Sequence, residues 1–276
     1  MQARIDRERF GPWALVTGAS SGIGSEFARQ IAASGIHVVL VARREALLEE
    51  VGRGLANDFG VEYRSVVADL SQGGFLEKLA EATDDLDIGL VVSNAGTGNP
   101  GQFLKIDRHE LEKLLRLNTL AHLDIAHHFG QKLAERGQGG LLLVGAMGAD
   151  KGIPYMANDA AAKAYIQAFA QSLHVELKAL GVHVTALSPA PTETPVLAKF
   201  GLTPQNMPMK PMKVERCVHE ALEALEANRS MIIPGRVNRI MNAVIPATLT
   251  RAMMAKMFEK ALANKLAAPH TQAEVR

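Results

Sequence analysis

The chain has 276 residues, 47% of them hydrophobic, and a formal net charge of +1. This length is normal for one doubly wound α/β unit, and the near-zero charge argues against nucleic acid as the main partner. The single cysteine, Cys217, excludes an internal disulfide and suits a reducing compartment. Residues 1–12 lack the apolar core of a signal peptide, and no apolar run reaches the length of about 18 residues that a membrane span needs. We therefore expect a cytoplasmic protein.

Short apolar runs alternate with longer amphipathic stretches, which is the pattern of βαβ units. In chain order, the predicted strands cover residues 13–16, 36–41, 61–67, 89–93, 141–144, 183–188 and 231–233. The predicted helices cover residues 22–34, 44–58, 72–83, 107–135, 156–180 and 213–228. The sequence predicts an α/β fold with a single Rossmann-type, doubly wound and mainly parallel sheet that carries helices on both faces.

Two segments depart from this alternation. Residues 189–212 contain six prolines, at 189, 191, 195, 204, 208 and 211, and we expect a mobile substrate loop or lid there. Residues 236–276 follow the last predicted strand. The predicted organisation is one domain over residues 1–235 with a C-terminal extension over 236–276.

Five segments match or resemble, in order, the signature motifs of one enzyme family. They are Thr17-Gly-Ala-Ser-Ser-Gly22-Ile-Gly24, Asp69-Leu70, Ser93-Asn94-Ala95-Gly96, Asn118 and Ser188-Pro189-Ala190-Pro191-Thr192. On these motifs, residues 10–235 resemble the short-chain dehydrogenases/reductases, whose glycine motif is TGxxxGIG and whose later segment is PGxxxT. Ala190 stands where that segment usually has Gly. The resemblance implies a nicotinamide-dependent oxidoreductase.

The glycine motif lies between a predicted strand and a predicted helix, where backbone N–H groups and the positive end of the helix dipole meet a pyrophosphate. Arg43 follows the second predicted strand, where NAD-preferring proteins usually place an acid. A guanidinium there matches the 2′-phosphate of NADP, and a solvated charge at a helix start is the alternative. We predict NADP(H) as the cofactor. By resemblance, Thr192 approaches the nicotinamide carboxamide, and the other residues around the cofactor are Gly18, Ser20, Ser21, Gly22, Ile23, Gly24, Asp69, Leu70, Asn94, Ala95, Gly96, Lys163 and Pro189.

The motif that carries the family's chemistry is incomplete. The family has Tyr-x-x-x-Lys with a Ser thirteen residues before the Tyr, whereas this chain has Asp159, Lys163 and, at the Ser position, Ala146. By resemblance, Lys163 retains the contact with the nicotinamide ribose, and Asn118 retains a place in a proton relay. Ala146 offers a substrate oxygen no side-chain hydrogen bond.

Asp159 is a poor replacement for the Tyr if its pKa is ordinary. At a pKa of about 3.9, roughly one molecule in a thousand carries the neutral acid at pH 7, and Asp is less basic than Tyr by about 6 pK units. Lys163 lies four residues later, so an ion pair on one helix face is expected, and burial of Asp159 would act against that charge. Ordinary ketone reduction by the family mechanism is therefore disfavoured.

Tyr155 is a second candidate proton donor. Enoyl reductases of this fold use a Tyr seven residues before the Lys, and Tyr155 lies eight residues before Lys163. That difference is a rotation of about 100° on a helix. A role in lining or packing a pocket is the alternative for Tyr155.

The C-terminal extension is basic and apolar. Between Arg229 and Lys265, seven Lys or Arg residues accompany one acid, Glu259, and apolar residues recur near helical spacing with a break at Pro246. Such a segment can lie on an anionic membrane surface through residues 236–265, cover an apolar pocket, or pack against another subunit. We favour a lid or packing role, and each option points to a hydrophobic substrate or partner. By resemblance, the protein forms a homodimer or homotetramer through the helices that carry Asn118 and Lys163.

Three functions remain open on the sequence. The first is an NADP(H)-dependent oxidoreductase with altered acid–base chemistry, acting on an activated C=C or C=O bond of a hydrophobic substrate. The second is a catalytically inactive NADP(H)-binding protein that acts as a regulator or partner subunit. The third is a non-redox lyase or isomerase that uses Asp159 as a base, and the intact dinucleotide motif argues against it because such a reaction needs no nicotinamide.

Overall fold

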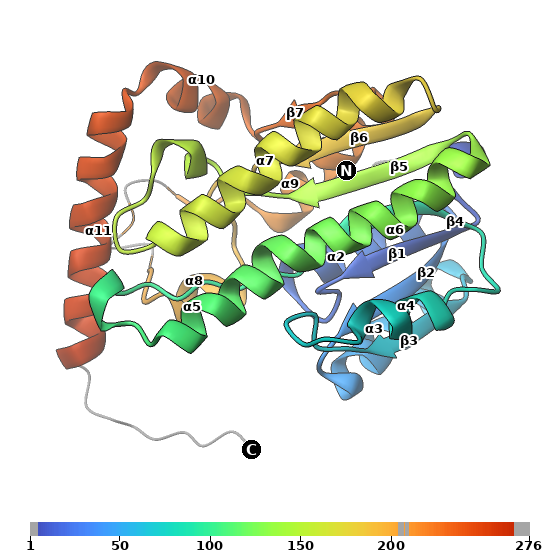
Figure 1. Ribbon diagram of the computed structural model, residues 1–276, viewed down its shortest axis with the longest axis horizontal. Helices are drawn as coiled ribbons and strands as arrows, with labels where there is room; N and C mark the ends of the chain where they lie inside the picture. Colours follow the sequence, from blue (N-terminus) through green and yellow to red (C-terminus); the bar gives the residue numbers. More distant parts are fainter. Residues whose placement is uncertain (1–4, 204–206, 208–209, 268–276) are drawn as a thin grey trace.

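The computed structural model describes residues 5–203, 207 and 210–267. Within them, seven parallel strands form one sheet in the order β3-β2-β1-β4-β5-β6-β7 (Figure 1). The strands are β1 (Trp13–Thr17), β2 (His37–Ala42), β3 (Tyr63–Val67), β4 (Ile88–Ser93), β5 (Gly139–Val144), β6 (Val182–Leu187) and β7 (Met231–Ile232). Every residue of β4 and β5 is buried, as expected of parallel strands covered on both faces.

Helices cover both faces of the sheet, which confirms the predicted doubly wound α/β fold. One hydrophobic core lies under α2 (Gly22–Ala32), α3 (Glu45–Phe59) and α9 (Val214–Glu226). The other lies under α4 (Phe75–Glu81), α6 (Ala121–Arg136) and α7 (Ala157–Lys178). The remaining helices are α1 (Arg7–Phe10), α5 (Arg108–Leu115), α8 (Pro195–Lys199), α10 (Arg236–Val244) and α11 (Ala247–Ala267).

The strand order reverses between β1 and β4. The chain passes from β1 outward to β2 and β3, and then returns to place β4 on the other side of β1. At such a point the loops that leave the two strands diverge above and below the sheet and leave a crevice at the carboxyl ends. The fold therefore locates a ligand cleft beside the glycine motif that follows β1.

The helix predicted over residues 107–135 is not continuous. A π-helical turn, Arg116–Leu120, separates α5 from α6 and contains the buried Asn118. Single π turns insert one extra residue into a helix and are frequent at functional sites. Hydrophobic periodicity does not reveal such an insertion because the apolar pattern continues on both sides.

The C-terminal extension consists of two helices that break at Pro246, as the pattern predicted. Figure 1 shows α11 standing across the end of the molecule toward which the strand arrows point. Phe258 and Ala261 of α11 are buried in a third, smaller cluster with Met156 and Leu202. Among the described residues, no helix is both long and apolar enough to cross a membrane.

Two glycines of α3 give a direct test of this packing. A Cβ on Gly52 would lie 2.2 Å from the ring of Tyr63, whereas a Cβ on Gly54 would meet nothing within 4 Å. Gly54→Ala should therefore stabilise the protein by about 0.5–1 kcal/mol through helix propensity. Gly52→Ala should destabilise it by about 1–3 kcal/mol because the Tyr63 ring must move. Urea unfolding of the two variants checks the opposite signs, and equal shifts would contradict the packing of α3 on β3.

Candidate active site

A cavity of about 580 Å³ lies at the carboxyl ends of β1 and β4. The turn after β1, the start of α3 and the loops after β3 and β4 line it on one side, and α8 lines it on the other. The predicted cofactor residues that line it are Gly18, Ser20, Ser21, Gly22, Ile23, Arg43, Asp69, Leu70, Asn94, Ala95 and Gly96. The strand order thus brings together four motifs that are far apart in the sequence.

The glycine turn has the geometry that a phosphate cradle requires. Gly18 and Gly22 have φ values of +68° and +60°, which side chains rarely allow. Gly24 lies behind the turn, where a Cβ would come within 2.2 Å of the Gly18 carbonyl oxygen. Ser21 precedes α2 without capping it through its side chain, so the first N–H groups of this helix have no side-chain acceptor there. These groups are placed to bind an anion.

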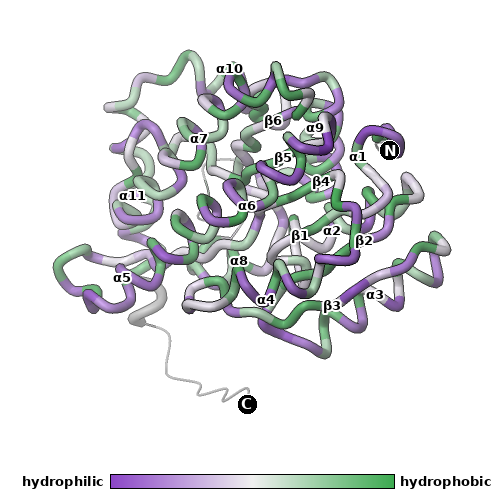
Figure 2. The backbone as a smooth tube through the Cα atoms, turned by 45° about the vertical axis from the view of Figure 1, so that its right-hand side comes forward, coloured by the Kyte–Doolittle hydropathy of each residue, from purple (hydrophilic) through white to green (hydrophobic). Residues whose placement is uncertain are grey.

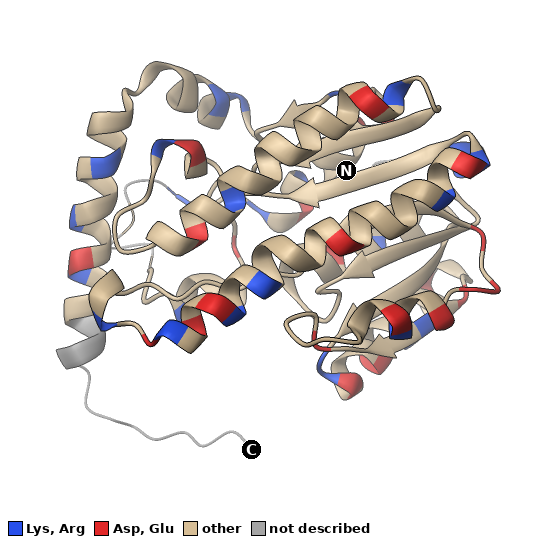
Figure 3. Cartoon of the chain, in the orientation of Figure 1, with Lys and Arg blue, Asp and Glu red and all other residues tan. Residues whose placement is uncertain are grey.

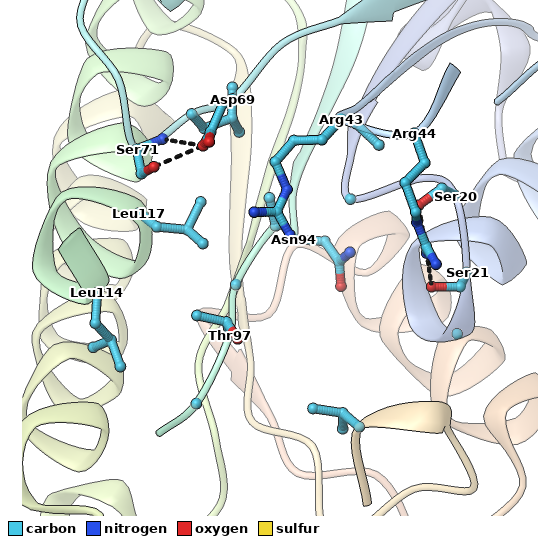
Figure 4. Close-up of a pocket in the computed structure, with 18 of the residues that line it drawn as sticks. Ser20, Ser21, Arg43, Arg44, Asp69, Ser71, Asn94, Thr97, Leu114 and Leu117 are labelled. Carbon is cyan, nitrogen blue, oxygen red and sulfur yellow. Dashed lines mark hydrogen bonds between the residues drawn. The ribbon is translucent and has the colours of Figure 1, made fainter. Parts of the chain in front are cut away.

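Two arginines lie at one end of this cavity. Arg44 donates from Nη2 to the Ser20 and Ser21 hydroxyl oxygens, at 3.0 and 3.1 Å (Figure 4). Arg43 lines the same cavity, and in this view its side chain extends between Asp69 and Asn94. A guanidinium held by two hydroxyls, with a second guanidinium on the preceding residue, has the chemistry that suits a phosphate monoester. Arg44 was not among the residues predicted from the sequence, although it follows Arg43 directly.

Asp69 also lines the cavity, and Ser71 fixes its carboxylate. Ser71 donates to Asp69 Oδ1 from its backbone N at 3.0 Å and from its hydroxyl at 2.7 Å (Figure 4). Partial burial acts to raise the pKa of Asp69, but these two hydrogen bonds and the charges of Arg43 and Lys113 together lower it. Asp69 is therefore a fixed, charged acceptor.

Buried polar side chains hold the loop after β4. The Thr17 hydroxyl accepts from the backbone N of Asn94 and Ala95, at 2.9 and 3.0 Å. Asn118 exchanges two hydrogen bonds with the backbone of Thr97, accepting at 3.0 Å and donating at 2.7 Å. The extra residue of the π turn is therefore used to aim Asn118 at this loop.

His122 of α6 also bonds to the loop after β4. It was not predicted as a site residue. Its Nε2 lies 3.0 Å from the Ala95 carbonyl oxygen, and its Nδ1 lies 2.8 Å from the Ser93 hydroxyl. Burial, with a smaller contribution from the Lys163 ammonium, lowers the pKa of His122 to about 3. The ring is neutral, so Nε2 donates to the carbonyl and Nδ1 accepts from Ser93. Its position four residues after Asn118 was the available signal.

Lys163 lies where the loop after β4 meets the end of β5. Its ammonium donates to the Val144 carbonyl oxygen at 2.9 Å, and a Cβ on Gly96 would lie 3.1 Å from Nζ. Burial lowers the pKa of Lys163 to about 8, with the Asp159 carboxylate acting in the opposite direction. Nearby, the backbone carbonyl of Ala146 accepts from the buried Gln167 amide at 2.6 Å. Residue 146 thus makes this hydrogen bond through its backbone, since its methyl side chain can make none.

Asp159 differs from the expectation of an ordinary, ion-paired carboxylate. Its exposed fraction is 7%, and it accepts from the backbone N of Asn99 at 3.4 Å. The expected ion pair with Lys163 is not formed in the described structure, since that ammonium is directed to Val144. Burial raises the pKa of Asp159 to about 6, although the Asn99 N–H and Lys163 both act to lower it. At pH 7, about one molecule in ten then carries the neutral acid.

A second cavity, of about 570 Å³, is lined by Asp159. Asn99, which donates to the Asp159 carboxylate, lines both cavities. The lining of the second cavity is mostly apolar and includes Ala255 of α11; its other residues are Gly101, Gln102, Phe103, Leu104, Lys105, Ile106, Leu111, Pro154, Tyr155, Met156, Ala157 and Asn158. The C-terminal extension therefore contributes a wall to this cavity.

Tyr155 lines the second cavity, but its hydroxyl is engaged elsewhere. The residue precedes α7 and has a φ of +63°, so the helical rotation assumed for it does not apply. Its hydroxyl donates to Glu259 Oε1 of α11 at 2.7 Å, which raises the pKa of Tyr155. In this arrangement Tyr155 ties α11 to the site.

Of the predicted Thr192 and the nearby Thr194, only Thr194 lines the first cavity. Thr192 is buried, and its hydroxyl donates to the Ala190 carbonyl at 2.8 Å instead of facing the cavity. Thr194 lines the cavity, and a Cβ on Gly22 would lie 3.2 Å from its methyl group. Counting the PGxxxT spacing from Pro189 leads to position 194, so the signal was present in the sequence. Pro189 itself does not line the cavity, and its carbonyl accepts from the backbone N of Met147 at 3.0 Å.

The α8 segment lies in the predicted lid. Lys199 donates to the Thr97 hydroxyl at 2.7 Å. Phe200 packs so closely on Gly98 that a Cβ there would lie 2.3 Å from its ring. These contacts place α8 against the loop after β4 and over the first cavity. Residues 204–206 and 208–209 of the predicted lid lie outside the described residues.

Comparison with known proteins identifies the family. The profile described as short chain dehydrogenase matches residues 12–204. The chain belongs to this family. It is 31% identical over 233 residues to the 7β-hydroxysteroid dehydrogenase of Clostridium sardiniense, covering 84% of this chain and 89% of that protein.

Two other matches bear on the site. A solved short-chain dehydrogenase from Sphingobium yanoikuyae in complex with NADPH has a TM-score of 0.77 and 28% identity, over 96% of this chain and 99% of that one. The human inactive hydroxysteroid dehydrogenase-like protein 1 is 30% identical over 185 residues, covering 66% of this chain and 56% of that protein. Similarity thus extends to an NADPH complex and to a relative that is named inactive.

The environment of Asp159 predicts a specific titration. With ¹³C-labelled aspartate and Asp159→Asn to assign the resonance, the Asp159 carboxyl should titrate near pH 6. Lys163→Met should raise this pKa further because a neighbouring positive charge is removed. Lys132→Met, a lysine on α6, is the control and should leave it unchanged. A midpoint near 4 in the unmodified protein would contradict the buried environment.

Proposed function

We propose that the protein is an NADP(H)-dependent oxidoreductase in which Asp159 takes the place of the family's Tyr as proton donor to a hydrophobic substrate. The observation that supports this most is the position and state of Asp159. Its buried carboxyl has a pKa of about 6, lines the second cavity and feels the charge of Lys163. A proton donor works best when its pKa lies near the operating pH.

The first cavity fits the cofactor. The positive φ values at Gly18 and Gly22 and the uncapped start of α2 suit the pyrophosphate. Arg43 and Arg44 suit the 2′-phosphate, while Asp69, Asn94 and Thr194 supply polar groups along the remaining wall. The similarity to an NADPH complex supports the same assignment. When bound, NADPH supplies the hydride.

The residues of this chain supply the proton and the positive charges that stabilise the carboxylate left behind. The Asp159 carboxyl releases its proton to the substrate atom that becomes basic as hydride is added, and the carboxylate that remains is stabilised by the nearby Lys163 ammonium. Lys199, held over the site by Thr97, adds a second positive charge that acts on Asp159. Asp159 is then reprotonated from solvent. Hydride and proton together saturate one double bond.

Ala146 restricts which double bond is reduced. A ketone oxygen gains negative charge during hydride addition, and Ala146 provides no side-chain donor for it. An enone spreads that charge over a conjugated system and takes its proton at carbon. We therefore favour an activated C=C bond, with a ketone as the poorer substrate. The apolar lining of the second cavity calls for a bulky hydrophobic molecule, and the similarity to a hydroxysteroid dehydrogenase points the same way.

A cofactor-binding protein without turnover is the second candidate. Two substitutions favour it, since Ala146 and Asp159 together remove the family's Ser and Tyr while the cofactor cavity is intact. The relative named inactive supports the same possibility. Such a protein would act through what it binds when NADP(H) is present.

Cofactor preference tests the first cavity. Arg43→Ala/Arg44→Ala should weaken NADPH binding by at least about 100-fold, because each lost charge-assisted hydrogen bond contributes about 1.5–3 kcal/mol. NADH binding should change little, since NADH has no 2′-phosphate. Titration followed by the fluorescence of the reduced nicotinamide measures both, with Arg53→Ala on the outer face of α3 as the control. An equal loss for NADPH and NADH would contradict the assigned phosphate site.

Turnover tests Asp159. With NADPH and a panel of bulky enones and ketones, absorbance loss should be faster with enones, and Asp159→Asn should slow it by at least about 100-fold while NADPH still binds. Because the acid must be protonated, the rate should be constant below pH 6 and fall about tenfold per pH unit above it.

The two candidate functions give different results in the same assay. Tight NADPH binding with no turnover, followed by ketone reduction in the Ala146→Ser/Asp159→Tyr variant, would favour the inactive protein. Enone turnover that Asp159→Asn abolishes would exclude it. If NADPH does not bind, both proposals fail.

A further inference from the structure

The helix α10 presents its apolar side to solvent. Val237, Ile240 and Val244 are 67%, 63% and 71% exposed, and their spacing of three and four residues places them on one face. Leu249, at the start of α11, is exposed as well, at 51%. Hydrophobic residues recur along α10 in Figure 2. We call Val237, Ile240, Val244 and Leu249 the α10 face.

The inner side of α10 is polar and is bonded to the protein. Asn238 is buried and donates to the Pro234 carbonyl at 2.8 Å. Arg239 donates to Glu220 Oε2 at 3.0 Å and to the Ile233 carbonyl at 2.9 Å. Lys151 donates to the carbonyls of Asn242 and Ile245. Surface helices usually turn their apolar side toward the core. In α10 the polar side faces the protein instead, and these hydrogen bonds hold it in that orientation.

Positive charge surrounds the α10 face. Between residues 236 and 263 there are five basic residues, Arg236, Arg239, Arg251, Lys256 and Lys260, and one acid, Glu259. Figure 3 shows this excess of basic residues on α10 and α11. Glu259 accepts the Tyr155 hydroxyl but keeps its negative charge, and Arg239 is paired with Glu220. The remaining basic residues, Arg236, Arg251, Lys256 and Lys260, outnumber this one acid, so the net charge of residues 236–263 is positive.

Exposed apolar side chains together with positive charge favour one kind of partner over another. A second copy of the chain, seated face to face, would bring two clusters of like charge together at a cost. An anionic bilayer satisfies both features, because acyl chains accept the apolar side chains and acidic headgroups attract the cations. No groove or sheet edge is needed for such contact.

We propose that the α10 face docks on the surface of an anionic lipid bilayer, with Val237, Ile240, Val244 and Leu249 entering the headgroup region and Arg236, Arg251 and Lys256 contacting acidic headgroups. This docking does not depend on the reaction proposed above. It places α11, whose Ala255 lines the second cavity, next to the bilayer.

Vesicle flotation of the full chain tests the proposal. The protein should float with vesicles of equimolar phosphatidylcholine and phosphatidylglycerol, and binding should weaken at high salt. Val237→Ser/Ile240→Ser/Val244→Ser should reduce binding by at least about tenfold because the buried apolar area is lost. Val175→Ser/Leu180→Ser is the matched control: these residues are 72% and 46% exposed near the end of α7, and binding should be unchanged. Arg236→Gln/Lys256→Gln should reduce binding to these vesicles while circular dichroism melting is unchanged.

Three results would overturn the proposal. The first is no flotation of the unmodified protein, and the second is equal flotation of the triple Ser variant. The third is binding that vanishes with the triple Ser variant only because light scattering shows an oligomer dissociating, which would assign the α10 face to a second copy. Loss of flotation with an unchanged oligomeric state supports bilayer docking.

Discussion

Burial of one carboxyl group, that of Asp159, sets its protonation state. Asp159 is buried where it lines the second cavity, and the Lys163 ammonium donates to the Val144 carbonyl instead of pairing with the carboxylate. Burial therefore outweighs attraction, and the pKa rises to about 6. An acid that would be fully ionised in water becomes one that is partly protonated near neutral pH.

The surroundings of Asp159 depend on the loop after β4, which a network of buried polar side chains holds in place. Thr17, Asn118 and His122 come from β1, the π turn and α6, and each bonds to this loop. The loop in turn carries Asn99, whose N–H contacts Asp159, and Thr97, which contacts Lys199 of α8. The first cavity, Asp159 and α8 are thus all connected through this one loop.

Much of the fold and of the cofactor cleft was predictable because these features follow local rules. Parallel strands are buried on both faces, and the glycine turn needs φ values that its own residues supply, so the sequence displays both. Arg44, His122 and Thr194 were missed although each lies within a few residues of a recognised motif. The π turn at Asn118 leaves no trace in the hydrophobic pattern, and Tyr155 could not be placed because its φ of +63° puts it outside α7.

The identity of residues at 146 and 159 already establishes that the family's Ser and Tyr are absent, since this depends only on the order of amino acids. Whether Asp159 can carry a proton depends on how much water and charge surround it, and groups from β5, α8 and the loop after β4 set that environment. The direction of the α10 face likewise required the folded chain. An amphipathic pattern gives two sides to a helix, and only its hydrogen bonds to Glu220, Pro234 and Lys151 show which side faces outward.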